Sequence, residues 1–162
     1  MVDVVDKATR SRMMSSIKSK NTKPERLVRE HLHRAGFRYR LQVKNLPGKP
    51  DLVLPKYRAV ICVHGCFWHA HRCDYFRLPA SNRAFWTQKL GGNVVRDKLN
   101  AIRLRRLGWR LLVVWECAVR ASTLSGSTAL YRMATKWLRS SQESYLELRG
   151  NSGHAISGRR ST

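Results

Sequence analysis

The segment VHGCFWHAHRC, residues 63–73, gathers three histidines and two cysteines, which are side chains that readily bind metal ions. Cys66 and Cys73 lie within it, and Cys117 follows a distant apolar run. These thiols and one histidine would complete a tetrahedral zinc site, and the spacing allows either His69 or His71 as the fourth ligand. The alternative is buried thiols and exposed imidazoles without a metal. A zinc ion with four protein ligands has no open position, so this site would be structural and could not activate water.

Asp51, in the segment PGKPDLVL, is the candidate for chemistry that a closed zinc site cannot perform. An aspartate at the start of a strand most often completes a turn. However, the chain has only 10 acidic residues beside 32 basic ones, so each carboxylate is of interest. The strand that Asp51 opens should lie beside the next one, which ends at Val63 and His64. His69 follows one short loop later.

This arrangement is typical of metal-assisted hydrolysis of a phosphodiester. Magnesium prefers hard oxygen ligands and keeps part of its water shell. Asp51 and a main-chain carbonyl near Val63 could supply such ligands. A neutral histidine could then accept the proton of an attacking water molecule.

The charge of the chain indicates what it binds. A net charge of +22 exceeds what solubility requires, and nucleic acid is the polyanion best suited to offset the self-repulsion. A hydrophobic content of 43% and five tryptophans favour a folded domain over a disordered basic arm. The sequence shows no run of about 18 apolar residues and no secretory signal, so we expect a cytoplasmic protein without a membrane span.

Three segments are expected to be helical. Residues 21–36 begin with proline and glutamate near the start and end on a glycine, as helices do. From residue 81 we expect a short helix, a break at Gly91 and Gly92, and a second helix that Asn93 caps. The buried stripe of this second helix would be Val95, Leu99 and Ile102. Residues 127–140 predict a last helix.

Strand patterns lie between these helices. The alternation in FRYRLQV predicts a half-buried strand over 37–43. Residues 51–54 and 59–65 predict a hairpin, and the apolar run 109–116 predicts a central strand covered on both faces. The order of elements favours an α/β fold, a small mixed sheet flanked by helices.

Together these residues resemble the very short patch repair (Vsr) endonucleases, a family that nicks DNA at T:G mismatches. The matching segments keep their order over roughly residues 1–120. They are DKATRSRMM, LPGKPD, VHGCFWHAHRC, AFWTQKLGGNVVRD and LGWRLLVVWEC. The resemblance implies a restriction-endonuclease-like mixed β-sheet flanked by helices, with a structural zinc site.

The resemblance also implies roles for individual residues. Asp51 would be the essential magnesium-binding carboxylate, together with the main-chain carbonyl of Val63, and His69 would be the general base. Glu25 and His64 would support metal-bound water and phosphate. The zinc ligands would then be Cys66, His71, Cys73 and Cys117.

DNA recognition would depend on aromatic residues. Phe67, Trp68 and Trp86 resemble side chains that wedge into the base stack beside the mismatch. A T:G wobble pair is unstacked more easily than a Watson–Crick pair, and an aromatic ring can replace the lost stacking, worth about 1–3 kcal/mol per base. Three further residues resemble DNA contacts of the family: Met14, Lys89 and Asn93.

We therefore expect a magnesium-dependent endonuclease that nicks the strand 5′ of the mispaired T in T:G mismatches left by deamination of 5-methylcytosine. Its partners would be double-stranded DNA, the mismatch-repair protein MutL and, functionally, a cytosine-5 DNA methyltransferase. It would act on the bacterial nucleoid. The alternative is a zinc-stabilised DNA-binding module without catalysis. The expected domains are a DNA-contacting arm over 1–20, the nuclease domain over 21–140 and a flexible basic tail over 141–162.

Overall fold

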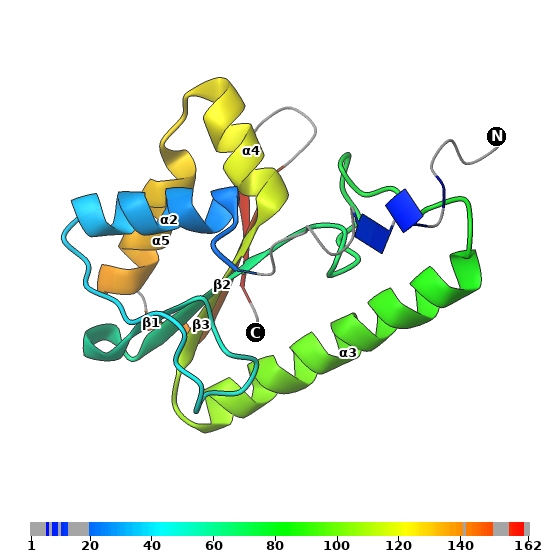
Figure 1. Cartoon of the computed structure of the whole chain (residues 1–162). Coiled ribbons are helices and arrows are strands. Elements are labelled where there is room, and N and C mark those ends of the chain that lie inside the picture. The colour runs from blue at the N-terminus through cyan, green and yellow to red at the C-terminus, as the bar shows by residue number, and fades with distance from the viewer. Residues whose placement is uncertain are drawn as a thin grey trace.

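The computed structural model is a five-stranded mixed β-sheet with helices on both faces (Figure 1). The structure describes residues 6, 8–9, 11–12, 20–140, 142–150 and 156–160. The helical elements are α2 (Lys23–Arg34), α3 (Arg83–Arg106), α4 (Glu116–Ser125), α5 (Ala129–Ser140) and the 3-10 turn η1 (Pro55–Tyr57). The strands are β1 (Leu52–Leu54), β2 (Ala59–His64), β3 (Arg110–Trp115), β4 (Tyr145–Gly150) and β5 (Ile156–Arg160). This architecture confirms the predicted α/β class.

The strands lie in the order β1-β2-β3-β4-β5. The outer pairs β1/β2 and β4/β5 are antiparallel, whereas β3 is parallel to both of its neighbours. β3 is buried at the centre of the sheet, as its unbroken apolar sequence LLVVW requires. In the β2/β3 register, Val63 pairs with Val114 and His64 with Trp115. The segments that follow these two strands therefore meet at one edge of the sheet.

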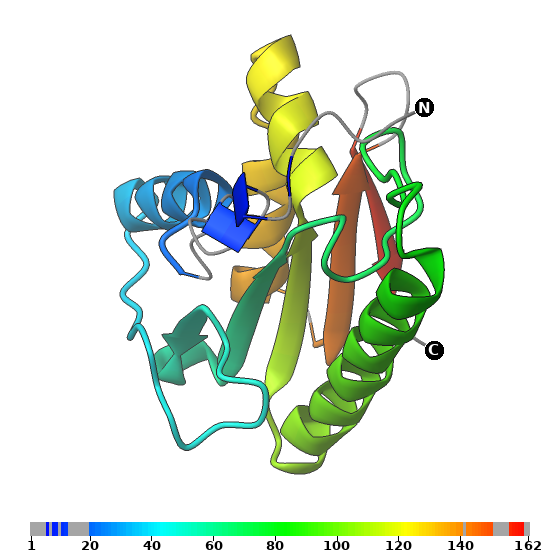
Figure 2. The same ribbon diagram turned by 45° about the vertical axis from the view of Figure 1, so that its right-hand side comes forward.

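Helices lie on both sides of the sheet (Figure 2). The buried apolar residues form two clusters, one on each face. α2, α4 and α5 cover one face, where Leu32 belongs to the same core cluster as Ile61 of β2. α3 covers the other face and has only two buried residues, Leu90 and Leu104. Because few α3 side chains fill this layer, space is left between α3 and the sheet beside residues 63–73.

α2 lies within the segment predicted to be helical, residues 21–36. Thr22 is the N-cap, and its hydroxyl accepts a hydrogen bond from the Glu25 N–H (3.4 Å). The Glu25 carboxylate accepts in return from the Thr22 hydroxyl (3.0 Å) and from the Asn21 N–H (2.9 Å). This capping box satisfies donors that the first helical turn leaves free. Gly36 follows the helix with a φ of +88°, a value that residues with a Cβ rarely adopt.

Residues 37–43 do not form the predicted strand. Within the described chain, this segment pairs with the sheet only through a bridge between Arg40 and Val53. The alternation is kept in part, because Phe37 is buried and Tyr39 and Val43 are half-buried, but Leu41 is 41% exposed. The extended conformation ends at Gln42, whose φ is +55°.

α3 runs without a break through Gly91 and Gly92, which corrects the predicted interruption. Each glycine costs a helix about 1 kcal/mol relative to alanine. The hydrogen bonds of a cooperative 24-residue helix offset that cost. Asn93 consequently lies inside the helix and caps nothing. The prediction that Val95, Leu99 and Ile102 form a buried stripe is wrong as well, because these side chains are 58%, 47% and 41% exposed, respectively.

The sequence predicts a flexible tail over 141–162, which is wrong for the parts that the structure describes. β4 pairs with β3, and β5 pairs with β4. Leu146 and Leu148 of β4 are buried in the core. The apolar alternation in this strand is short and lies among serine, glycine and arginine residues, so the local composition conceals it. α4, which follows β3 directly, is a further helix that the sequence pattern did not predict.

Candidate active site and metal centre

Four metal-binding side chains converge where the chain leaves β2 and β3. Their ligand atoms all lie within 4.8 Å of one another, and they belong to Cys66, His71, Cys73 and Cys117. The first three residues come from the loop after β2, and Cys117 lies in the first turn of α4, directly after β3. Because β2 and β3 are parallel neighbours, the fold brings this loop and this helix together.

Contacts around Cys117 favour a metal centre over unpaired thiols. Cys117 Sγ lies 3.6 Å from His71 Nδ1 and accepts a hydrogen bond from the Gly150 N–H (3.4 Å). The hydrogen bond between Cys66 and Cys117 lowers the pKa of Cys117 and raises the pKa of Cys66, so Cys117 is the thiol of this pair that ionises first. Gly150 is required here, because a Cβ would come within 2.6 Å of the Cys117 carbonyl oxygen. Three sulfur atoms and one imidazole form the donor set of a structural zinc site.

Asp51 lies directly before β1, and its carboxylate reaches across to β2. Its Oδ2 accepts a hydrogen bond from the Val63 N–H (2.7 Å). Burial raises the pKa of Asp51 to about 6, against the opposing effect of this hydrogen bond. The charge of Glu25 raises the pKa further, and Arg29 lowers it. A buried carboxylate whose charge is poorly solvated is well suited to bind a cation.

His69 is held by Asp97, a residue of α3 that the sequence pattern did not single out. His69 Nδ1 lies 2.5 Å from Asp97 Oδ2. An ionised carboxylate can only accept, so Nδ1 carries a proton, and Nε2 is the nitrogen with a free lone pair when the ring is neutral. The His64 ring stacks on the His69 ring, with centroids 3.8 Å apart and planes 3° apart. Burial lowers the pKa of His64 to about 3, so this imidazole is neutral.

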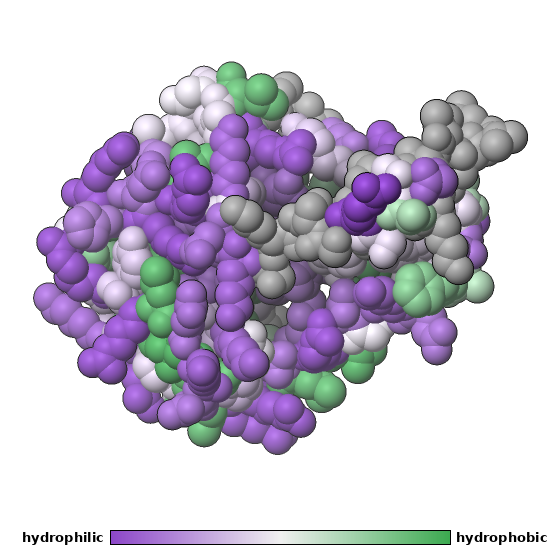
Figure 3. Space-filling model, viewed as in Figure 1, coloured by the Kyte–Doolittle hydropathy of each residue, from purple (hydrophilic) through white to green (hydrophobic). Residues whose placement is uncertain are grey.

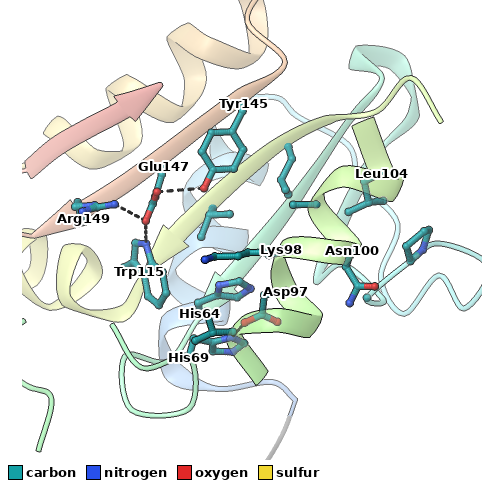
Figure 4. Close-up of a pocket in the computed structure, with 17 residues that line it drawn as sticks. His64, His69, Asp97, Lys98, Asn100, Leu104, Trp115, Tyr145, Glu147 and Arg149 are labelled. Atoms are coloured by element: carbon teal, nitrogen blue, oxygen red, sulfur yellow. Dashed lines mark hydrogen bonds and ion pairs between the residues drawn. The ribbon is translucent and has the colours of Figure 1, made fainter. Parts of the chain in front are cut away.

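The two histidines face a cavity of about 310 Å³ between α3 and the sheet (Figure 4). His64, His69 and Asp97 lie together on one side of it. Polar residues of β4 line the other side: Tyr145, Glu147 and Arg149. The cavity therefore connects the candidate catalytic residues with a strand that the sequence did not predict.

Trp115 links the cysteine cluster to the histidine pair. Its ring stacks on His71, with centroids 4.1 Å apart, and meets the His64 ring edge-on at 5.3 Å. Trp115 Nε1 donates a hydrogen bond to Glu147 (2.6 Å), and the Glu147 carboxylate also accepts from Arg149 (2.7 Å). β4 thus holds an indole that is in contact with both sites.

Glu25 has an evident structural role. It is 3% exposed, and besides completing the capping box it accepts a hydrogen bond from Arg29 (3.0 Å). The same carboxylate acts electrostatically on Asp51. Helix capping therefore fixes an acidic group near the candidate catalytic carboxylate.

Phe67, Trp68 and Trp86 form a half-buried aromatic group beside these sites. The Phe67 ring lies 5.1 Å from Trp68 and 5.4 Å from Trp86, between centroids. Lys89 Nζ lies 5.9 Å from the Trp68 ring and 5.8 Å from the Trp86 ring. Asn93 Nδ2 donates to the Trp68 carbonyl (2.8 Å), which ties the loop to α3. Met14 lies outside the described residues.

Comparison with known proteins identifies relatives across most of the chain. Residues 2–75 match the family model of the DNA mismatch endonuclease Vsr. The DNA mismatch endonuclease Vsr of Escherichia coli K12 is 45% identical over 138 residues, which is 85% of this chain and 88% of that protein. The chain belongs to the Vsr family. The type II nicking enzymes V.NmeAIP of Neisseria meningitidis serogroup A and V.XorIIP of Xanthomonas oryzae pv. oryzae are 46% and 45% identical over 120 and 117 residues, respectively. These matches span 74% and 72% of this chain and 86% of each relative.

Two acidic residues at the cavity of this Vsr-family chain, Asp97 and Glu147, were not predicted from the sequence. Asp97 ends the motif AFWTQKLGGNVVRD, and an acid among the many bases of α3 is a signal that could have been used. Glu147 carries no local signal, because its contacts join β4 to β3 only in the folded chain.

Among the described helices, none has the length and apolar content needed to cross a membrane.

Proposed function

We propose that this protein is a magnesium-dependent mismatch endonuclease that nicks the DNA strand 5′ of the mispaired T in T:G mismatches. Membership of the Vsr family supports the reaction class. The observation that carries the proposal is the placement of Asp51 at the Val63 main chain, near the hydrogen-bonded pair of His69 and Asp97. A carboxylate for a hard cation and an oriented imidazole that can act as a base are what hydrolysis of a phosphodiester requires.

The catalytic steps are assigned to residues of this chain. Asp51 and the Val63 carbonyl would hold Mg²⁺, which supplies charge stabilisation at the phosphate. His69 Nε2 accepts the proton of the attacking water, while Asp97 holds Nδ1 and keeps the ring in the required tautomer. His64, neutral and stacked on His69, keeps that ring in place. Glu25 contributes negative charge near Asp51.

Several surface features suit DNA. A groove on α2 is lined mainly by basic side chains: Arg26, Arg29, His33 and Arg34, together with Glu30 and Tyr39. The face of the molecule that carries α2 is predominantly hydrophilic (Figure 3). Such a surface can contact phosphates without reading the sequence. The N-terminal arm over 1–20, including Met14, would add contacts on the minor-groove side.

One assay separates this proposal from its rivals. Duplexes that differ only in a T:G or a T:A pair are incubated with the protein, with and without magnesium. We expect a nick 5′ of the mispaired T only in the T:G duplex and only with magnesium. Equal cutting of both duplexes would indicate a general nuclease. Binding without cutting would indicate the alternative, a zinc-stabilised DNA-binding module.

The biological setting follows from the substrate. T:G mismatches arise when 5-methylcytosine is deaminated, so the protein would serve a cell with a cytosine-5 DNA methyltransferase. It would act on chromosomal DNA in the bacterial cytoplasm and hand the nicked strand to repair partners such as MutL.

The cysteine cluster would hold a structural Zn²⁺ ion through Cys66, His71, Cys73 and Cys117. We expect His71→Ala to lose this zinc and to lower the melting temperature by roughly 10 °C or more, because zinc binding contributes directly to folding. His69→Ala is the matched control, since this imidazole lies outside the cluster and should retain zinc. Metal analysis and thermal unfolding of both purified variants test the assignment. Zinc loss in the His69 variant alone would reverse it.

The aromatic group would replace the base stacking that is lost beside the mismatch. We expect Phe67→Ala to slow nicking of the T:G duplex about tenfold to a hundredfold, which corresponds to the loss of one stacking contact. Phe85→Ala is the control. Phe85 is 55% exposed, and of the three rings of the aromatic group it contacts only Trp86. Nicking rates at saturating magnesium and zinc contents are measured together. Equal rates for Phe67→Ala and the unmodified protein would remove the wedge from the mechanism.

A further inference from the structure

His64, His69 and Asp97 form a second group of metal-binding side chains, distinct from the cysteine cluster. One ligand atom of each residue lies within 4.8 Å of the others. All three side chains are half-buried, and they come from β2, the following loop and α3. The proposed catalysis uses His69 as a proton acceptor and assigns no metal ion to this group.

We propose that His64, His69 and Asp97 bind a divalent transition-metal ion such as Zn²⁺ and that this ion inhibits DNA nicking. Two imidazoles and one carboxylate suit Zn²⁺, Co²⁺ or Ni²⁺. Mg²⁺ instead prefers the oxygen ligands around Asp51. The inhibitory part rests on the proposed function. An ion shared by Asp97 and His69 takes the place of the proton on Nδ1, so the neutral ring carries its proton on Nε2 and has no lone pair left to accept the proton of water.

The geometry allows both rings to reach one ion after a small rearrangement. A metal lies close to the plane of each imidazole that binds it, but the His64 and His69 rings are stacked face to face, with centroids 3.8 Å apart. Two stacked rings cannot both have one ion in their planes, and rotation of the His64 ring about its Cβ–Cγ bond removes this obstacle. The adjacent cavity of about 310 Å³ provides room for that rotation and for water on the remaining coordination position. Asp97 Oδ2 already lies at His69 Nδ1, so these two atoms can share the ion in place of the proton between them.

The surroundings make this site weaker than the cysteine centre. It offers three protein ligands instead of four and no thiolate. Lys98 also lines the cavity, and its positive charge opposes a bound cation, whereas Arg149 is paired with Glu147 (Figure 4). The ion would therefore bind reversibly, after the cysteine cluster has been filled, and nicking would fall when free zinc is in excess.

Binding is tested without reference to activity, by titrating the purified, zinc-containing full-length protein with Co²⁺. We expect one Co²⁺ per chain, with weak visible absorption bands and without the intense thiolate charge-transfer band that the cysteine cluster would produce. His64→Ala and Asp97→Asn should each weaken this binding at least about tenfold, a loss seen even for outer partners of metal ligands. Lys98→Ala, which removes a cation from the same cavity, should bind Co²⁺ as tightly or more tightly. Retained zinc in each variant shows that its fold is intact.

Two results of this titration would overturn the site. One is an unmodified protein that binds no Co²⁺ beyond its zinc. The other is unchanged Co²⁺ affinity in both His64→Ala and Asp97→Asn.

The inhibitory role is tested by adding Zn²⁺ to a nicking reaction that contains saturating magnesium. We expect nicking to fall, to recover when a weak chelator is added, and not to recover when magnesium is raised. Relief by magnesium would place the inhibiting ion at Asp51, and unchanged or faster nicking would also overturn the inhibitory role. A protein that shows no nicking in magnesium alone contradicts the proposed function, and the Co²⁺ titration then still decides whether the site exists.

Discussion

Replacing Asp51 by asparagine is expected to reduce nicking of a T:G duplex by about a thousandfold or more. The amide has nearly the shape of the carboxylate but lacks the charge that would hold Mg²⁺ at the Val63 main chain. A metal ion contributes several kcal/mol of charge stabilisation to hydrolysis, and each 1.4 kcal/mol corresponds to a factor of ten in rate. Single-turnover nicking at several magnesium concentrations measures the effect.

The matched control for Asp51 is Glu30→Gln. Glu30 is another carboxylate close to the basic groove of α2, but it is exposed and pairs only loosely with Arg34, at 3.9 Å. Its loss should leave nicking within a factor of about two, as for most exposed ion pairs. Substantial nicking by Asp51→Asn, with zinc retained, would show that the metal is held elsewhere.

The same substitution is expected to stabilise the fold at neutral pH. Burial raises the pKa of Asp51 from 3.8 to about 6, so the folded state disfavours the ionised form. The contribution of the Asp51 carboxyl to the free energy of unfolding is therefore fully present below pH 3.8, and it is lost as the pH rises through about 6. In magnesium-free buffer, Asp51→Asn should raise the free energy of unfolding by up to about 3 kcal/mol at pH 8 and by little near pH 4. Denaturant unfolding at both pH values tests this sign, and a destabilised variant at pH 8 would contradict it.

Removing the proposed base is the second large effect. We expect His69→Ala to slow nicking by about 10²–10⁴-fold, the usual contribution of a general base, while binding of mismatched DNA and zinc content stay unchanged. Because His69 Nε2 is the atom that accepts the proton, small external bases such as imidazole should restore part of the rate. Measurement of nicking with and without added imidazole distinguishes a missing base from a damaged fold.

Asp97→Asn tests the orientation of that base. The amide can still contact His69, but it no longer requires the proton to be on Nδ1, so the fraction of correctly oriented imidazole falls. Nicking should drop about tenfold or more, and added imidazole should restore less than it does for His69→Ala because the native ring still occupies the site. If His69→Ala cuts T:G duplexes at the unmodified rate, the proton goes elsewhere and both roles are wrong.

Local sequence patterns determined the elements that carry the site. The capping residues Thr22 and Glu25 define the start of α2, because they satisfy the free N–H groups of the first turn. The short β-rich runs around Pro55–Tyr57 define the hairpin in which Asp51 faces Val63. The apolar run of β3 defines the centre of the sheet. Cys66, His71 and Cys73 are close in sequence, so one loop contains three of the four residues of the cysteine cluster.

The spacing of the residues left open which histidine joins which partner, and only the tertiary structure brings the chosen atoms together. Spacing along the chain allows His69 or His71 to reach the cysteines, whereas the folded loop brings His71 to Cys117 and His69 to Asp97. Both partners come from other elements, α4 and α3, so no local pattern encodes the choice. The same reason applies to β4, whose Glu147 contacts Trp115 across a parallel strand pair. Parallel pairing and the packing of α3 depend on contacts far apart in sequence, and these contacts determine that His71 lies at the cysteine cluster and His69 at Asp97.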